Sequence, residues 1–300
     1  MTGLLLCGAT GHLGSRISAR LAERGLPFRA LLRAERGLPG PPQHAETVTG
    51  DLTDPVSLDR AVRGVQTVIT TVNAVGRWRP GATDMSIARI DRDGNAALIR
   101  AAEAAGVERF VFVSALPGAD SVAGLVPLFD AKRATEQLLH HSTLRAIIVR
   151  PAAFQETWLG PAAGIRPDKR RAVILGRGRN PVPYVAQDDV AEACIRLATM
   201  QDPPGAVDFG GPEALTRHEV VDIFEKITGD RFRRIVVPRP VLAAGARALR
   251  RRQPELATGL GIAVSMDVSS YPGPGALRAL GIQPRSASAY IIRQVASPGT

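Results

Sequence analysis

The chain has almost no cysteine, few aromatic residues and no long hydrophobic run. Cys7 and Cys194 lie far apart in apolar stretches, so neither a disulfide framework nor a metal cluster is expected from them, and we expect a reducing, cytoplasmic environment. No apolar run reaches the roughly 18 to 20 residues that a membrane span needs. The N-terminus shows no basic region followed by a cleavage site, so we expect no export signal.

Lysine is also scarce, although the chain is basic. The net charge is +10, yet only three of the 38 basic residues are lysines, and the arginines are scattered rather than gathered into one stripe. Aromatic residues at 4% leave little to stack on bases. We interpret the charge as a solvated basic surface, reflecting an Arg-, Ala-, Gly- and Pro-rich composition, and expect no nucleic acid or membrane partner. The 300 residues with 45% hydrophobic content indicate a globular chain.

Short apolar runs alternate with helical patterns through the first half. Continuously apolar runs are typical of strands covered by helices on both faces. The predicted strands are Gly3–Cys7, Phe28–Leu32, Glu46–Thr49, Thr67–Val72, Phe110–Val113 and Ala146–Val149. The predicted helices are His12–Arg24, Pro55–Val62, Asp91–Ala105 and Ala131–His141, with Gly25, Gly64 and Gly106 as C-terminal stops. This order predicts an α/β, Rossmann-like, doubly wound parallel sheet.

After Pro151 the pattern becomes shorter and richer in Pro and Gly. It predicts a smaller C-terminal lobe, with a first domain over 1–150 and an interleaved substrate-binding lobe over 151–300. The predicted helices are Asp189–Thr199, Arg217–Thr228 and Pro240–Arg252. A capping box at Thr216–Glu219 opens the second of them. The predicted strands are Ala172–Leu175, Val207–Phe209 and Arg234–Val237. The tail from Gly259 to Thr300 is expected to be partly mobile.

The first predicted strand is followed directly by a glycine motif that opens the first helix. The motif is Gly8-Ala-Thr10-Gly11-His12-Leu13-Gly14. Glycines here permit a tight turn and close approach of the backbone to a pyrophosphate, which the helix N-terminus then binds. We therefore predict a dinucleotide site made by these residues.

The end of the second strand indicates which dinucleotide binds. An NAD-preferring site places Asp or Glu there, whereas this chain has Arg33. An arginine pairs with a 2′-phosphate through charge-assisted hydrogen bonds, so NADPH is the predicted cofactor. Two interpretations of Arg36 are open, a second phosphate contact or a solvated side chain.

Further motifs carry a family resemblance over nearly the whole chain. They are Gly8-Ala-Thr-Gly11, Gly50-Asp51-Leu52, Gly94-Asn95, Gly106–Val111 leading to Ser114, Lys132, Arg150-Pro151, Asp189-Val190-Ala191 and Gly210-Gly211-Pro212. With them the chain resembles the short-chain dehydrogenase/reductase superfamily, in its atypical, NmrA-like branch.

The resemblance implies where the rest of the cofactor lies. Asp51 and Leu52 would flank the adenine, the loop at 71–74 with Asn73 would pass the nicotinamide ribose, and residues from Pro151 to Phe154 would line the nicotinamide. A second interpretation of Asp51 is a turn-forming aspartate after a strand.

The chain departs from this family at its proton donor. Ordinary members pair a tyrosine with a lysine four residues later, and a Ser or Thr assists the tyrosine. Lys132 is present here, but Leu128 and Leu116 occupy the other two positions. Lys132 is expected to anchor the ribose, with an exposed helical lysine as the alternative. Ser114 either contacts cofactor or substrate, or satisfies backbone groups at a strand end.

Loss of the tyrosine leaves the source of the proton open. Candidates on the chain are His12, Asn73, Ser114, Asp130 and Gln155, of which the family geometry favours Asn73 and Ser114. We favour the substrate itself, because a phenol beside a carbonyl carries an internal hydrogen bond and leaves a stabilised phenolate. Aromatic polyketides have that arrangement.

On these grounds the chain resembles the tyrosine-less angucyclinone ketoreductases of antibiotic pathways, of the simocyclinone-pathway type. The small-molecule substrate would be an aromatic ketone under Trp78, Phe129, Phe154, Trp158 and the Pro240–Arg252 helix, although these aromatics are equally explained as core. A non-catalytic NADP(H)-sensing regulator that binds a protein is the main alternative. A nucleotide-sugar epimerase or dehydratase is disfavoured by the missing tyrosine. The sequence leaves the oligomeric state open, with a monomer among the options.

Overall fold

The computed structural model describes residues 3–33, 45–75 and 86–296. The chain forms two compact units, and each contains segments that are distant in sequence. The first contains Met1–Ala115, Leu128–Arg150 and Val190–Val207; the second contains Leu116–Pro127, Pro151–Asp189 and Asp208–Thr300. Residue 150 is therefore one of several points where the chain passes from one unit to the other. Arg36 and Trp78 lie outside the described residues.

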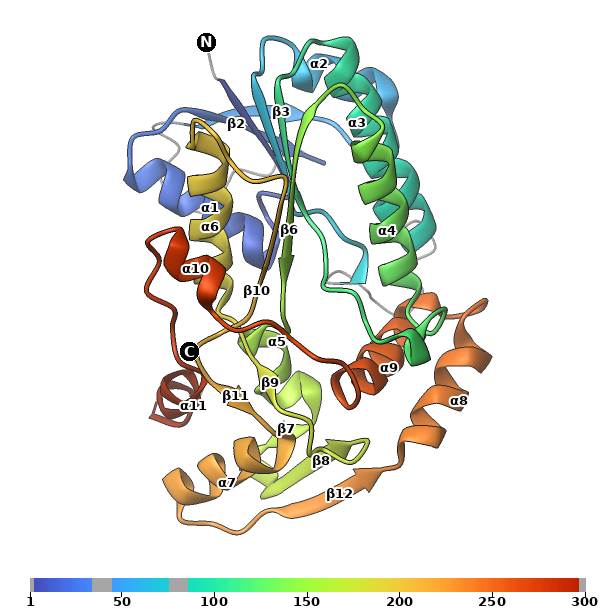
Figure 1. The fold of residues 1–300 in the computed structure, drawn as a ribbon, viewed down its shortest axis with the longest axis vertical. Coiled ribbons are helices and arrows are strands. Elements are labelled where there is room, and N and C mark those ends of the chain that lie inside the picture. The colour runs from blue at the N-terminus through green and yellow to red at the C-terminus, as the bar shows by residue number, and fades with distance from the viewer. Residues whose placement is uncertain (1–2, 34–44, 76–85, 297–300) are drawn as a thin grey trace. The chain divides into compact units, whose positions relative to one another are not determined.

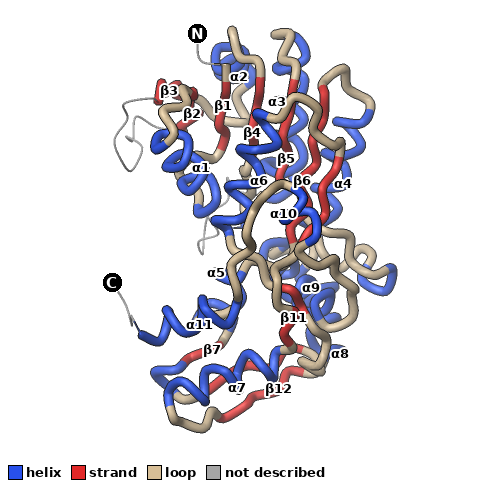
Figure 2. The backbone as a smooth tube through the Cα atoms, turned by 60° about the vertical axis from the view of Figure 1, so that its left-hand side comes forward, coloured by secondary structure: helices blue, strands red, loops and turns tan. Residues whose placement is uncertain are grey.

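A seven-stranded sheet organises the first unit, in the order β10-β6-β5-β4-β1-β2-β3 (Figures 1 and 2). Its strands are β1 (Leu4–Cys7), β2 (Phe28–Leu32), β3 (Ala45–Thr49), β4 (Thr67–Thr70), β5 (Arg109–Val113), β6 (Arg145–Pro151) and β10 (Ala206–Phe209). The pairings that join β1 through β6 are all parallel. The order reverses at β1, which places a ligand-binding switch point at the carboxyl ends of β1 and β4. The predicted doubly wound sheet is confirmed.

Helices cover both faces of this sheet, with α1 and α6 on one side and α2, α3 and α4 on the other (Figure 1). They are α1 (His12–Glu23), α2 (Pro55–Val62), α3 (Asn95–Ala104), α4 (Pro127–His140) and α6 (Gln187–Thr199). A π-helix, η2 (Ala88–Gly94), runs directly into α3, where the sequence predicted one uninterrupted α-helix. Coverage on both faces explains the apolar strands, since Leu5, Leu6 and Phe110 have no exposed surface.

The second unit contains two small sheets and several helices. The sheets are β12-β8-β7 and β11-β9, built from β7 (Ile165–Arg166), β8 (Arg171–Leu175), β9 (Val182–Pro183), β11 (Ala214–Leu215) and β12 (Arg233–Val237). The helices are α5 (Gln155–Trp158), α7 (Arg217–Thr228), α8 (Arg239–Leu249), α9 (Pro254–Met266), α10 (Gly275–Ala279) and α11 (Ala287–Ala296). The capping box that begins α7 is formed, because the Thr216 side chain accepts from the Glu219 N–H at 3.1 Å and the Glu219 carboxylate accepts from the Thr216 N–H at 2.8 Å.

The C-terminal segment is more ordered than its composition suggested. Residues up to 296 complete α9 and form α10 and α11, where a partly mobile tail was expected. Leu277, Ala287 and Ile291 are completely buried, and Ile291 packs in one core with Val220 and Val221 of α7. The apolar spacing of α11 carries this core contact, and the Gly- and Pro-rich composition around it obscured that spacing.

Candidate functional site

The turn between β1 and α1 brings the helix against the strand. Gly8 has φ +88°, a left-handed conformation that favours glycine, and its carbonyl oxygen accepts from the Gly11 N–H at 2.9 Å. A Cβ added to Gly14 would overlap that same carbonyl oxygen, so only glycine lets α1 begin this close to β1. The helix N-terminus therefore lies at the carboxyl edge of the sheet.

The first turn of α1 is open to an anion. Gly11 is the N-cap in an extended conformation, no side chain caps the helix within the described structure, and the first turn carries no acidic residue. The N–H groups of a first helical turn have no intrahelical acceptor, and the helix dipole adds positive potential. Thr10 and His12 are exposed, whereas Leu13 is buried. These backbone groups fit a dinucleotide pyrophosphate.

Arg33 follows β2 at the same edge of the sheet. Cys7 at the end of β1 pairs in register with Leu31, so the chain leaves both strands side by side. The Arg33 side chain is exposed. An exposed cation beside the glycine turn suits the phosphate on an adenosine ribose; the neighbouring Arg36 lies in the segment that is not described.

Asp51 and Leu52 follow β3 and belong to a local turn. The Asp51 Oδ1 atom accepts from the Thr53 N–H at 2.8 Å and from the Thr53 hydroxyl at 2.7 Å. Leu52 is 6% exposed and packs in the core, where a Cβ on Gly94 would approach it at 2.9 Å. The turn-forming role of Asp51 is thus observed, and contact with the adenine stays a prediction for both residues.

Lys132 is held at the centre of the carboxyl edge rather than exposed on its helix. It is 5% exposed, and its Nζ donates to the Val113 carbonyl oxygen at 3.0 Å and lies 3.8 Å from Asp91 Oδ1. The ammonium also stands 4.7 Å from the centre of the Phe112 ring. Burial lowers the pKa of Lys132 from its usual value, while the carboxylates of Asp91 and Glu136 act in the opposite direction.

Asp91 is a buried acid at this edge of the sheet that sequence reasoning missed. It has no exposed surface, and its Oδ2 accepts from the backbone N–H of Ala74 at 2.9 Å. One carboxylate therefore links η2, the lysine of α4 and the loop after β4. Asn73 lies within that loop, between Val72, whose carbonyl oxygen is 3.5 Å from Lys132 Nζ, and Ala74. The loop predicted to pass the nicotinamide ribose is thus anchored on both sides of Asn73.

Ser114 donates its hydroxyl to Glu136, a second buried acid that the sequence analysis did not identify. Glu136 is 4% exposed and accepts from Arg150 Nε at 3.0 Å and from Arg150 Nη2 at 2.7 Å. Burial opposes ionisation of Glu136, but the hydrogen bonds from Arg150 and Ser114 outweigh it and hold its pKa below the usual value. Ser114 is therefore engaged with a carboxylate.

The remaining candidates occupy varied positions. Leu116 is 7% exposed, and Leu128 packs with the apolar cluster around Ile90 and Ala131. A leucine side chain has no proton to donate at either position. Asp130 is exposed on α4.

In the second unit, Pro151 ends β6, Phe154 forms an isolated bridge with Val185, and Gln155 is 1% exposed. Trp158 packs against the core of that unit, and Phe129 on α4 is half-buried.

The glycine turn, the helix without a side-chain cap and the switch point of the sheet together define a dinucleotide-binding fold. The chain belongs to the NAD(P)H-binding family, whose model matches residues 8–201. This match, together with the similar proteins described below, agrees with the resemblance to atypical, NmrA-like short-chain dehydrogenase/reductases. No helix within 3–33, 45–75 and 86–296 is long and apolar enough to cross a membrane.

Several known proteins are similar to the chain. A Streptomyces griseus (4-alkanoyl-5-oxo-2,5-dihydrofuran-3-yl)methyl phosphate reductase is 31% identical over 231 residues, covering 75% of this chain and 74% of its own. The photosystem II assembly factor Ycf39 of Synechocystis is 28% identical over 242 residues, or 80% and 72%. The Arabidopsis thaliana protein High Chlorophyll Fluorescence Phenotype 244 is 30% identical over 247 residues, and the chain spans 59% of its length. The NADPH complex of an Escherichia coli quinone oxidoreductase has a TM-score of 0.74 at 19% identity, covering 97% and 99% of the two chains, which shows the shared fold.

Gly11→Val tests the glycine turn. A Cβ at this position would lie 3.2 Å from the Gly8 carbonyl oxygen, and the larger side chain would extend toward the space in front of the helix. We expect NADPH affinity to fall at least about a hundredfold, because two or more charge-assisted hydrogen bonds of about 1.5 to 3 kcal/mol each would be lost. Calorimetric titration measures this. Gly259→Val is a matched control, since a Cβ there meets no atom within 4 Å; unchanged affinity in both variants would contradict the assignment.

Glu136→Gln tests the buried carboxylate, since it leaves Arg150 without its anionic partner. At pH 7 we expect a loss of about 2 to 3 kcal/mol in the free energy of unfolding, measured by urea denaturation. Because the folded-state pKa of Glu136 is lowered, its stabilisation is present above its unfolded pKa of about 4.5 and is lost as pH falls through the folded value. The difference from the unaltered protein should therefore shrink in acid. Asp93→Asn, which removes an exposed acid paired with exposed Arg92, should cost under about 1 kcal/mol; an equal effect of both variants would argue against the network.

Proposed function

We propose that the protein is an NADPH-dependent ketoreductase that reduces a carbonyl of an aromatic polyketide of the angucyclinone type in antibiotic biosynthesis. The observation that carries the proposal is the state of the proton-donor positions. Leu128 replaces the tyrosine, Ser114 donates to Glu136, and the Lys132 ammonium is occupied by Val113 and Asp91. A substrate that carries its own phenolic proton needs none of these groups as an acid.

Arg33 supports NADPH over NADH. The side chain is exposed beyond β2, beside the glycine turn, at the position where an acidic residue would accept from an unphosphorylated ribose. A 2′-phosphate would be attracted to the guanidinium and would have been repelled by an acid. The similarity to named reductases, including the Streptomyces griseus protein, supports the reductive direction.

In this mechanism the residues of the chain bind the cofactor and orient its ribose. When bound, NADPH supplies the hydride. The first turn of α1 would bind the pyrophosphate, and Lys132 and Asn73 at the carboxyl edge would orient the ribose. Asp91 fixes both of them, through the ammonium and through the Ala74 N–H. The proton on the new hydroxyl comes from the adjacent phenol, which stays on the product as a phenolate and regains a proton from water.

A non-catalytic NADP(H)-binding regulator is the second candidate, and the similarity to photosystem II assembly factors favours it. A regulator of this kind would keep the cofactor site. It would not need the tyrosine, because it would catalyse no hydride transfer. The protein would then bind another protein in place of a small-molecule ketone. Turnover of a matched ketone pair separates the two functions.

The pair is 8-hydroxy-1-tetralone, whose phenol hydrogen-bonds the ketone, and 8-methoxy-1-tetralone, which lacks that proton. We expect the hydroxy compound to be reduced and the methoxy compound to bind but turn over about a hundredfold or more slowly, as when a general acid is removed. Ser114→Ala and Asn73→Ala should each lower turnover of the hydroxy compound far less. NADPH oxidation followed by absorbance measures both.

Equal turnover of the two ketones would exclude proton donation by the substrate while keeping the reductase. Tight NADPH binding with no oxidation by either ketone, or by larger aromatic ketones, would favour the regulator.

A further inference from the structure

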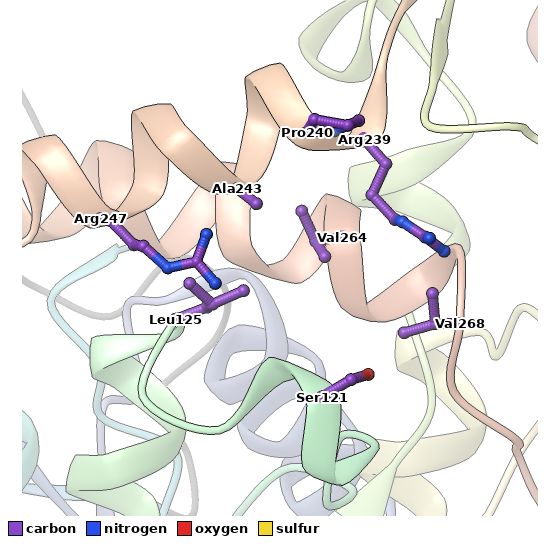
Figure 3. A pocket seen from close by; sticks show the side chains of 8 residues that line it. All are labelled: Ser121, Leu125, Arg239, Pro240, Ala243, Arg247, Val264 and Val268. Atoms are coloured by element: carbon purple, nitrogen blue, oxygen red, sulfur yellow. The ribbon is translucent and has the colours of Figure 1, made fainter.

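The second unit contains a cavity of about 250 Å³ between α8, α9 and the segment at 121–125 (Figure 3). Five of its lining residues are apolar: Leu125, Pro240, Ala243, Val264 and Val268. The volume lies just below the roughly 300 to 1,000 Å³ of typical small-molecule pockets. The space therefore suits a compact apolar group rather than a large ligand.

Both charged residues in the lining are arginines from α8. Arg239 and Arg247 are eight residues apart, about 12 Å along the helix at 1.5 Å per residue, so they mark two ends of the cavity. Figure 3 shows the Arg247 guanidinium turned toward Leu125 and that of Arg239 lying by Val264 and Val268. Among the described residues that line the cavity there is no acid.

The two arginines differ in how much of their charge is balanced. Arg239 Nη1 lies 3.9 Å from Asp267 Oδ2. Asp267 is itself fixed, because its Oδ1 accepts from the N–H groups of Arg177 at 2.8 Å and Gly178 at 3.0 Å. The Arg247 guanidinium has no side-chain partner among the described residues, so it is the cation available to an incoming anion.

The walls of the cavity are preformed. The Ala119 N–H donates to Ser269 Oγ at 2.9 Å, and Arg250 donates to the carbonyl oxygen of Gly124. A Cβ on Gly261 would overlap the Leu125 carbonyl, so α9 lies in direct contact with the segment that forms the opposite wall. A rigid cavity binds its ligand with little ordering cost.

We propose that this cavity binds a small aromatic anion, with its fused rings between Ala243 and the two valines Val264 and Val268 and its carboxylate or phenolate on Arg247. Charge complementarity and apolar walls carry this assignment. This site goes beyond the proposed function, because it is an anion site formed within the second unit alone.

The test is calorimetric titration of the full chain with 2-naphthoate, without NADPH. We expect binding of 2-naphthoate and at least about tenfold weaker binding of the neutral 2-naphthalenemethanol, because one charge-assisted hydrogen-bonded contact is lost. Decanoate distinguishes an aliphatic from an aromatic anion, and we expect it to bind more weakly than 2-naphthoate. Equal affinity for the acid and the alcohol, or tighter binding of decanoate, would overturn the proposal.

Arg247→Gln should weaken 2-naphthoate about tenfold, and Arg251→Gln, an exposed arginine outside the cavity, should leave affinity unchanged. Ala243→Phe should abolish binding by filling the space. Arg247 is preferred to Arg239 as the test, since replacing Arg239 would leave the buried Asp267 without its cation.

Unchanged binding in Arg247→Gln and Ala243→Phe would show that the anion binds elsewhere. Because the titration requires no turnover, binding at this cavity with no ketone reduction would leave this site intact and reject the ketoreductase. Ketone reduction by a protein that does not bind 2-naphthoate would support the ketoreductase and reject the anion site in this cavity.

Discussion

The buried ion pair between Asp91 and Lys132 holds together the edge of the sheet on which the cofactor site depends. It joins η2 to α4, and the other contacts of the same two side chains reach the ends of β4 and β5. Removing two charges from water costs several kcal/mol per ion, which is recovered only where hydrogen bonds satisfy both partners. The Ala74 N–H donates to Asp91 Oδ2 and the Val113 carbonyl oxygen accepts from Lys132, while Asp91 Oδ1 meets the ammonium at 3.8 Å. The pair therefore fixes the backbone at Ala74 and Val113 as well as the position of the Lys132 ammonium.

This arrangement explains how the site keeps its lysine although the tyrosine is missing. Lys132 keeps its place without a phenol beside it, because Asp91 provides the counter-charge that retains an ammonium in a buried position. Leu128 then only fills apolar space next to Ile90 and Ala131. The carboxyl edge remains suited to bind and orient a dinucleotide, and an acid for the product must come from another source. A phenolic substrate meets that requirement within the proposed ketoreductase.

Local patterns were sufficient to predict most of the fold. Strand β1 is a continuous apolar run between Gly3 and Gly8, and the glycine pattern at Gly8–Gly14 is typical of a strand–turn–helix that binds a dinucleotide. Asp91 and Glu136 were not predictable in this way, since Lys132, Ser114 and Arg150 lie at sequence distances from them that no helix or strand period relates. The π-helix that carries Asp91 has no local signal either. In the C-terminal segment, composition was a poor guide because α11 is stabilised by contacts with α7 across the core.

The central claim is that the carboxyl edge of this sheet is built for NADPH. Calorimetric titration of the unaltered protein with NADPH and NADH tests it most directly, with Arg33→Asp as the companion variant. We expect NADPH to bind about tenfold or more tightly than NADH, since a charge-assisted contact to the 2′-phosphate is worth about 1.5 to 3 kcal/mol, and we expect Arg33→Asp to remove the preference. Equal affinity of the unaltered protein for the two cofactors would contradict it.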